Sequence, residues 1–223
     1  MTVSPKDIPL EANVEVWNKI IHEAGVSKQW RYTDIHGVDS DRLSKIPAST
    51  ALILLFPSTD KYNEHIHAEE TRLAKLEQSI SPNVVFFKQT VQQACGMIAL
   101  LHSLANTTTD AATGPLFDFM EKSRLMSPDE RVEWLKESNE LKLLHEAAVE
   151  NGAALEEGHT DFHYVCFVEV DDHLYELDGR RPLPVNHGKT TDFVQGSAKV
   201  IKQYLDIDPD QHDFSVIALV ESK

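Results

Sequence analysis

Cys95 is the residue best placed in this sequence for nucleophilic chemistry, because it opens an apolar helical pattern just after an earlier apolar run has ended. A thiol in the first turn of a helix lies against the positive end of the helix dipole, which favours the reactive thiolate. Gln89, upstream of it, can aim an amide N–H at the space in front of the sulfur, where an oxyanion would form. The alternative is a buried structural cysteine beside a surface glutamine.

Two further residues of this kind lie in a predicted β-hairpin, whose β-rich runs flank a polar turn at residues 171–172. If Val170 pairs with His173 across a two-residue turn, His163 and Asp178 become diagonal neighbours on one face of the sheet. Their backbones are then roughly 7 Å apart, which is within side-chain reach. A turn longer or shorter by one residue would separate them, so the inference depends on the strand register.

Cysteine, histidine and aspartate in this order suit thiol chemistry of the papain type. Cys95 would be the nucleophile, and His163 would accept or hold its proton and later protonate the leaving amine. Asp178 would orient the imidazole and stabilise its charged form. Gln89 would donate to the tetrahedral oxyanion, together with the backbone N–H of Cys95.

Five longer strings occur along the chain: Pro9-Leu10-Glu11-Ala12-Asn13, Phe87-Lys88-Gln89-Thr90, Ala94-Cys95-Gly96, Leu174-Tyr175-Glu176-Leu177-Asp178-Gly179-Arg180 and Pro184-Val185-Asn186-His187-Gly188. Together, and in this order, they resemble the small ubiquitin carboxyl-terminal hydrolases over nearly the whole chain. The resemblance implies a thiol-dependent hydrolase that cleaves after the terminal glycine of ubiquitin through an acyl-enzyme. The expected adducts are small or flexible, and no cofactor is implied.

The resemblance also implies which residues contact ubiquitin. They are Pro9, Leu10, Glu11, Ala12, Asn13 and Val14 near the start, and Gln211, His212, Asp213, Phe214, Ser215 and Val216 near the end. Val14, His212 and Asp213 depart from the family pattern, which leaves open the choice between ubiquitin and a ubiquitin-like relative. The first segment can equally be an ordinary helix entrance.

Two other functions fit the same residues. One is a catalytically silent ubiquitin-binding protein, and the other is a different Cys–His–Asp acyl-transfer enzyme, such as an acyltransferase or transglutaminase.

The other cysteine and several histidines favour structural interpretations. Cys166 falls in an apolar strand, where a free cysteine is usually core. His102 shares a helix face with Cys95, but two turns separate their backbones by about 10.5 Å, so packing or a surface hydrogen bond is expected. His173 falls at the hairpin turn and is expected to be solvated, and His187 has no assigned role. Neither cysteine has metal-ligand spacing to the histidines, so no metal site is expected.

Composition predicts one acidic domain over residues 1–223. The formal net charge is −15, from 36 acidic and 21 basic residues. Such a field disfavours nucleic acid and anionic membranes and suits a basic partner, such as the arginine-bearing tail of ubiquitin. The chain shows no signal-peptide pattern and no apolar run of membrane-spanning length. With only two cysteines, a cytosolic location is expected, with the nucleus as an alternative. The chain is also expected to be a monomer.

The elements that must position these residues are both helical and extended. Helices are predicted from Asn13 to Ala24 and over residues 62–78, 94–106, 127–149 and 193–206, with strands at 51–57 and 214–221 and a loop at 150–161. This mixture predicts an α/β or α+β fold with a mainly antiparallel central sheet. The resemblance implies a six-stranded sheet sandwiched by helices, a papain-like core and a knotted backbone.

Overall fold

The computed structural model describes residues 12–37, 48–90, 94–107, 114–138 and 162–222, together with Ile46 and Glu146. The elements are α1 (Val14–Glu23), β1 (Trp30–Ile35), β2 (Ser49–Pro57), α3 (Asp60–Leu73), α4 (Cys95–Ala105), α5 (Pro115–Arg124), α6 (Pro128–Glu137), β3 (Phe162–Val170), β4 (His173–Leu177), β5 (Val185–Lys189), α8 (Phe193–Ile207) and β6 (Ser215–Glu221). Within these ranges no helix is long and apolar enough to cross a lipid bilayer.

The strands form one six-stranded sheet in the order β1-β6-β2-β3-β4-β5. Neighbouring strands run antiparallel in every pair of this sheet. The mainly antiparallel sheet predicted from the sequence is therefore confirmed. The implied knot stays a prediction, as does the loop at 150–161, which lies outside the described residues.

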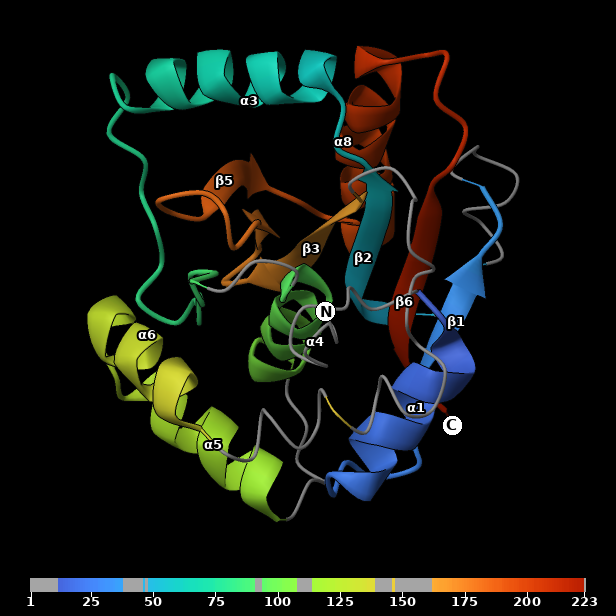
Figure 1. Ribbon diagram of the computed structural model, residues 1–223, viewed down its shortest axis with the longest axis vertical. Helices are drawn as coiled ribbons and strands as arrows, with labels where there is room; N and C mark the ends of the chain where they lie inside the picture. Colours follow the sequence, from blue (N-terminus) through green and yellow to red (C-terminus); the bar gives the residue numbers. More distant parts are fainter. Residues whose placement is uncertain are drawn as a thin grey trace, which may run out of the picture.

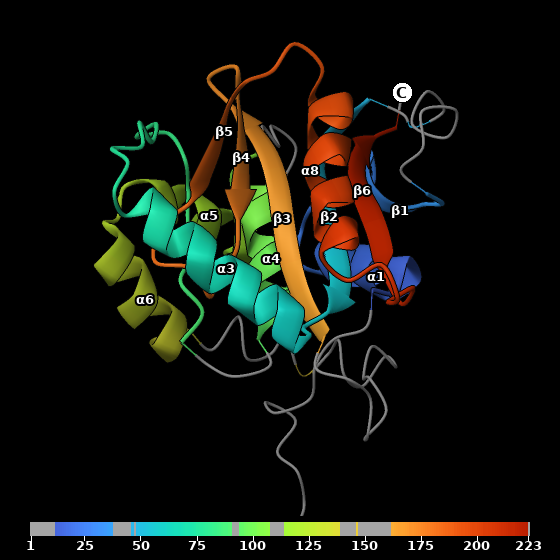
Figure 2. The ribbon, with the colours of Figure 1, turned by 90° about the horizontal axis from the view of Figure 1, so that it is seen from above.

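Helices cover both faces of the sheet. Figures 1 and 2 show α3 and α8 on one face, and α1 and α4 on the other with α5 and α6 beyond α4. The apolar run of β2 follows from this sandwich. Its alternate residues Ala51, Ile53 and Leu55 pack toward α4, whereas Leu52, Leu54 and Phe56 pack toward α8. A strand buried on both faces reads as a continuous apolar run rather than an alternating one.

Helix α4 lies at the centre of the molecule (Figure 1), and all of its residues are buried. It packs against β2, β3 and α5. A helix that is apolar on all sides is expected to be enclosed in this way. The predicted helix at 94–106 is confirmed, and its N-terminal cysteine is buried with the rest of it.

Local capping accounts for the first helix. Asn13 caps α1 by accepting hydrogen bonds from the backbone N–H groups of Glu15 and Val16, at 3.1 and 3.2 Å. After α1 the backbone turns at Gly25, whose φ of 99° is a conformation that glycine adopts without strain. Both ends of the predicted helix are confirmed.

The predicted hairpin has the expected register, because Val170 pairs with His173 and Cys166 with Leu177. Its two turn residues, Asp171 and Asp172, both have positive φ, 52° and 62°. Positive φ at both central residues is the requirement of a type I′ turn, the two-residue turn whose twist matches paired strands.

The prediction of one continuous helix from residue 127 to about 149 is wrong, although of residues 139–149 only Glu146 lies within the described ranges. The helix starts as expected, with a Ser127–Glu130 capping box and Pro128 in the first turn, but α6 ends at Glu137. Ser138 has an extended backbone, with φ −66° and ψ 115°. A serine with this ψ angle stops the helical hydrogen-bond pattern. Among the described elements, the sequence pattern did not predict β1, α5 or β5.

Candidate active site

Cys95 is the first residue of α4 and is only 4% exposed. Residues 91–93, directly before it, lie outside the described ranges, and Ala94 provides no side-chain cap. Cys95 thus lies in the first turn of the helix, as the sequence predicted. Both cysteines of the chain are free and buried.

His163 and Asp178 form a buried pair. The Nε2 atom of His163, near the start of β3, lies 2.7 Å from Oδ1 of Asp178, which follows β4. The side chains are 0% and 2% exposed. Asp178 Oδ1 also accepts the backbone N–H of Arg180 at 2.8 Å, and its Oδ2 accepts the hydroxyl of Tyr62 at 3.4 Å. The diagonal pair expected from the hairpin register is thus brought together.

The pair has complementary electrostatics. Burial lowers the pKa of His163, but the charge of Asp178 and the hydrogen bonds that the ring makes with Asp178 and Cys95 outweigh it, so the pKa is raised overall. Burial raises the pKa of Asp178, but the charge and hydrogen bond of His163 and the N–H of Arg180 hold it below its usual value. Both directions stabilise the imidazolium beside the carboxylate when His163 takes up a proton.

The thiol and the imidazole are neighbours. Because Nε2 of His163 is taken by Asp178, Nδ1 is the ring nitrogen left for Cys95. Within the described residues Nδ1 has no hydrogen-bond partner of standard geometry. The thiol–imidazole contact is therefore looser than the imidazole–carboxylate contact, as is common for catalytic groups before substrate binds.

Gln89 lies beside the same turn. Its backbone N–H donates to the carbonyl of Gly179 at 2.8 Å, one residue beyond Asp178. A Cβ on Gly179 would stand 3.1 Å from Cβ of Gln89 and 2.8 Å from Cγ2 of Ile98, a residue of α4. Only glycine permits this approach without displacement. The four predicted site residues are therefore gathered around the N-terminus of α4 and the end of β4.

The predicted ubiquitin contacts fall in two places. Pro9, Leu10 and Glu11 lie outside the described residues, and Ala12, Asn13 and Val14 form the half-buried entrance of α1. In the second segment Gln211, His212, Asp213 and Ser215 are exposed, Phe214 is half-buried, and Val216 is buried within β6. The helix-entrance interpretation is confirmed for Ala12, Asn13 and Val14, and the contacts themselves stay predictions.

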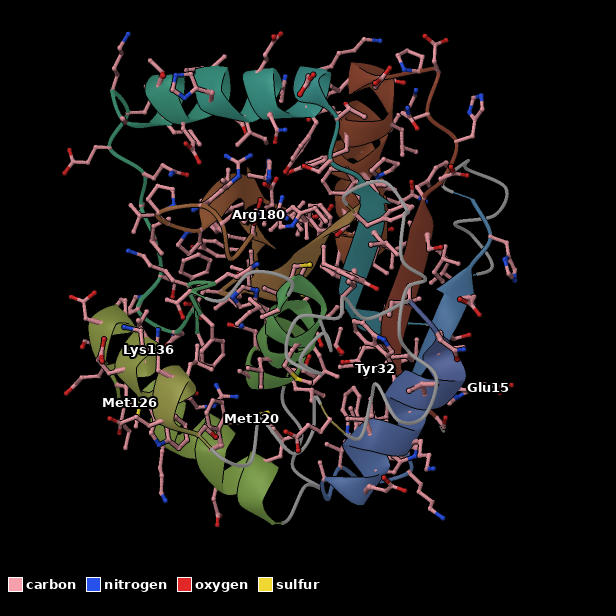
Figure 3. All side chains as sticks on the ribbon, in the orientation of Figure 1. Glu15, Tyr32, Met120, Met126, Lys136 and Arg180 are labelled. Carbon is pink, nitrogen blue, oxygen red and sulfur yellow. The ribbon has the colours of Figure 1, made fainter. Side chains whose placement is uncertain are left out.

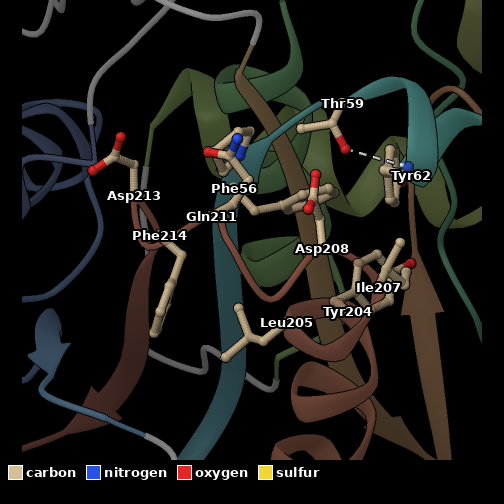
Figure 4. A pocket seen from close by; sticks show the side chains of 11 residues that line it. Phe56, Thr59, Tyr62, Tyr204, Leu205, Ile207, Asp208, Gln211, Asp213 and Phe214 are labelled. Carbon is tan, nitrogen blue, oxygen red and sulfur yellow. Dashed lines mark hydrogen bonds between the residues drawn. The ribbon is translucent and has the colours of Figure 1, made fainter.

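The second segment forms one wall of a shallow pocket (Figure 4). Gln211, Asp213 and Phe214 face Phe56 and Tyr62 across it. The ring of Phe56 packs edge-on to that of His163, with centroids 5.9 Å apart. One pocket wall therefore touches the histidine and, through the Tyr62 hydroxyl, the aspartate.

The remaining candidates have structural partners. Cys166 is fully buried in the core, as predicted, and burial raises the pKa of its thiol. His102 is also fully buried, so the surface hydrogen bond considered for it is wrong. His173 is half-buried, with Nδ1 3.1 Å from Oδ1 of Asn186. No three His, Cys, Asp or Glu residues in the described ranges are arranged to hold a metal ion.

His187, which had no assigned role, contacts a buried carboxylate that sequence reasoning missed. Its Nε2 lies 2.9 Å from Oε2 of Glu176. The other carboxylate oxygen, Oε1, accepts a hydrogen bond from the Tyr204 hydroxyl at 2.5 Å and forms an ion pair with Arg181 at 3.1 Å. Arg181 also pairs with Glu69. This cluster fixes the turn after Asp178, where Figure 3 shows Arg180 between α3 and α4.

The chain is similar to known proteins over almost its whole length. The family model for ubiquitin carboxyl-terminal hydrolase, family 1, matches residues 8–206. A ubiquitin carboxyl-terminal hydrolase of Drosophila melanogaster is 38% identical over 221 residues, covering 96% of this chain and 97% of the relative. The human isozyme L1 is 34% identical over 221 residues, with 96% and 98% covered.

A solved structure also has a similar fold. The catalytic domain of Trichinella spiralis UCH37, solved with bound ubiquitin vinyl methyl ester, matches with a TM-score of 0.74 at 22% identity. The match covers 96% of this chain and 95% of that one.

A buried His–Asp pair beside a cysteine at a helix N-terminus, on a sheet sandwiched by helices, is typical of a thiol hydrolase of the papain type. The family match and the curated relatives are more specific. The chain belongs to the ubiquitin carboxyl-terminal hydrolase family and is by that membership a cysteine-type deubiquitinase.

Proposed function

We propose that this chain hydrolyses the bond after the terminal glycine of ubiquitin, with Cys95 as nucleophile, His163 as base and acid, and Asp178 as the orienting carboxylate. The observation that carries the proposal is the buried His163–Asp178 pair beside the thiol at the start of α4, with Nε2 of the histidine 2.7 Å from Oδ1 of the aspartate. Burying two charged side chains costs free energy unless each has a well-placed partner. Active sites commonly contain charged groups that are buried in this way.

The proposed reaction proceeds through a thioester. Nδ1 of His163 takes the thiol proton, and Sγ of Cys95 attacks the carbonyl carbon of the terminal glycine to give a tetrahedral oxyanion. The imidazolium protonates the leaving amine as the carbon–nitrogen bond breaks. Water, deprotonated by His163, then attacks the thioester and releases the ubiquitin carboxylate and the thiol. The raised pKa of His163 suits a group that carries the proton between these steps.

Gln89 is proposed as an oxyanion donor. Its backbone is held by Gly179, close to the N-terminal half of α4, so its amide has a fixed origin near the sulfur. A pre-placed donor stabilises the transition state because it needs no reorganisation as the charge develops, and such a donor is worth about 3–4 kcal/mol in other hydrolases.

The proposed partner is ubiquitin, or a ubiquitin-like relative, carrying a small or flexible adduct. The exposed residues Gln211, His212 and Asp213 and the pocket beside them are the proposed contact surface, with the segment ending at Val14 as a second contact. The net charge of −15 supports a basic partner tail over nucleic acid or an anionic membrane. We further propose that residues 1–223 act as one monomeric catalytic domain in the cytosol, with the nucleus as an alternative location.

The two cysteines provide a matched experiment. Cys95→Ala should abolish hydrolysis of a ubiquitin-linked fluorophore and labelling by a thiol-reactive ubiquitin probe, while ubiquitin binding persists. Cys166→Ala should keep activity and lose some stability, because it leaves a small cavity in the core. An inactive Cys166→Ala enzyme beside an active Cys95→Ala enzyme would overturn the assignment. A parent chain that binds ubiquitin without hydrolysis would be a silent binding protein, and turnover that requires an amine acceptor would indicate an acyltransferase.

A further inference from the structure

The segment that carries Gln89 belongs to no helix or strand, yet side chains of α4 and of the turn after it bind its backbone. Asn106, directly after α4, accepts the N–H of Val85 and donates to the carbonyl of the same residue, both at 2.8 Å. One helical turn earlier, Nε2 of His102 accepts the N–H of Phe87 at 2.9 Å. These contacts replace the strand partner that the segment lacks.

The spacing of these contacts is regular. His102 and Asn106 are four residues apart in a helix, which is about 6 Å along the axis, and two residues of extended chain span about 6.6 Å. The segment and the helix run in opposite directions, because Asn106 binds Val85 and His102 binds Phe87. Beyond Phe87 the segment continues to Gln89, alongside the part of α4 that leads back to its N-terminus at Cys95.

The next contact in the progression comes from the turn after β4. The N–H of Gln89 donates to the carbonyl of Gly179, and Gly179 itself packs against Ile98, one turn before His102. The residues at 85, 87 and 89 are thus each bound at a defined height along α4. A shift of the segment by one residue would break all of these bonds together.

His102 is chemically suited to a fixed acceptor role. Burial lowers its pKa to about 3, so the ring is neutral at working pH and Nε2 keeps its lone pair. The rings of Phe86 and Phe87 pack on it, with the Phe86 centroid 5.2 Å away in a nearly parallel stack. The Leu177 backbone acts against burial by raising the pKa of His102, and Nδ1 makes no hydrogen bond of standard geometry within the described residues.

We infer that His102 and Asn106 are positioning residues, which set the register of residues 84–90 along α4 and thereby place the Gln89 amide in front of Cys95. The inference rests on the proposed oxyanion role of Gln89. Since one helix carries both the nucleophile and the two side chains that hold the donor segment, the distance between thiol and donor is set by the helix itself.

Three single variants test the inference. His102→Leu removes the acceptor of the Phe87 N–H, and Asn106→Ala removes both bonds to Val85. Thr107→Val is the matched control, because Thr107 is buried beside them but its hydroxyl donates to the Ser103 carbonyl within the helix region and leaves the segment untouched. Turnover of a ubiquitin-linked fluorophore gives kcat and KM, and mass spectrometry gives the alkylation rate of Cys95 by iodoacetamide.

Displacing the donor should lower kcat about 10- to 10²-fold in the first two variants, up to the loss expected for a missing donor, with KM changed less than about twofold. Alkylation forms no oxyanion, so its rate at Cys95 should match the parent. In a Gln89→Ala background, His102→Leu and Asn106→Ala should lower kcat no further, because both act through Gln89. Thr107→Val should behave as the parent in every measurement.

Three results would overturn the inference: unchanged kcat in both variants, parallel losses of hydrolysis and alkylation, or losses that multiply with that of Gln89→Ala. If circular dichroism shows that His102→Leu does not fold, Asn106→Ala at its half-buried position decides alone. A Gln89→Ala enzyme with the parent kcat would defeat the proposed oxyanion role itself. A slow Gln89→Ala enzyme with multiplying losses would defeat only the positioning inference.

Discussion

Replacing Gly179 with alanine tests how closely the proposed oxyanion donor must be held. Ordinary van der Waals contacts begin near 3.4 Å, whereas the added Cβ would meet Cγ2 of Ile98 at 2.8 Å and Cβ of Gln89 at 3.1 Å. The neighbours must therefore move by about 0.3–0.6 Å. Ile98 lies in the fully buried helix α4, so the segment that carries Gln89 is the part more able to give way.

The size of the effect follows from that displacement. A misplacement of about 1 Å can cost about 10²-fold in rate, so a shift of about 0.3–0.6 Å predicts a loss of kcat of roughly 4- to 16-fold. KM should stay within about twofold, because the ubiquitin contacts are untouched. Overpacking should cost about 1–3 kcal/mol of unfolding free energy, offset by about 0.4–1 kcal/mol from the restricted unfolded chain.

Gly196→Ala is the matched control. Its Cβ would also meet a close atom, Oγ1 of Thr190 at 2.9 Å, but on α8, remote from the thiol. The assay is steady-state hydrolysis of a ubiquitin-linked fluorophore, with urea unfolding of each variant. A folded Gly179→Ala enzyme whose kcat lies within about twofold of the parent would refute the reasoning, because crowding at the Gly179–Gln89 contact would then have no effect on catalysis.

Three other perturbations have defined outcomes. Asp178→Asn should lower kcat by about 10²-fold or more through the imidazole tautomer. The native pKa of Asp178 is lowered, so its stabilisation is lost as pH falls through that value; the native pKa of His163 is raised, so its stabilisation is lost as pH rises through that value. The difference in Tm between parent and Asp178→Asn should therefore be largest between about pH 4 and 6.5, and a difference that is constant from acid to alkaline pH contradicts the pairing. Glu176→Gln should lower the free energy of unfolding by about 3 kcal/mol, because Arg181 loses a buried partner, whereas the exposed Glu169→Gln should change it by less than about 0.5 kcal/mol in the same urea titration. Raising salt should reduce kcat/KM through slower association while kcat stays nearly constant, because screening acts over about 8 Å at physiological ionic strength; a flat kcat/KM would show that the −15 charge has no part in capture.

The parts of the site that the sequence could predict depend on local rules. A two-residue turn admits few registers, so the pairing of Val170 with His173 was enough to bring His163 and Asp178 together. The apolar pattern that starts at Cys95 likewise predicted the helix α4. In both cases residues close together in the sequence determine the local structure, so the alternation or periodicity of apolar side chains predicts it.

The parts that could not be predicted depend on partners distant in the sequence. Tyr62 reaches Asp178 from α3, and Arg181 joins Glu69 to Glu176, yet no spacing in the sequence relates these residues. The strand β5, Val185–Lys189, contains Asn186, His187 and Gly188 and lacks an apolar alternation, so only its pairing with β4 makes it a strand. The end of α6 at Glu137 likewise had no proline or glycine to mark it.

The hairpin that positions Asp178 and the contact that holds Gln89 lie at adjacent residues, 178 and 179. The hairpin register places Asp178, and the next residue, Gly179, supplies the carbonyl that holds Gln89. Cys95 is placed separately, by its position at the start of α4. A displacement of the turn after β4 should therefore disturb the imidazole and the oxyanion donor together, whereas a displacement of the residue 84–90 segment on α4 should disturb the donor alone. The pH dependence of kcat distinguishes the two, because only the first changes the groups that titrate.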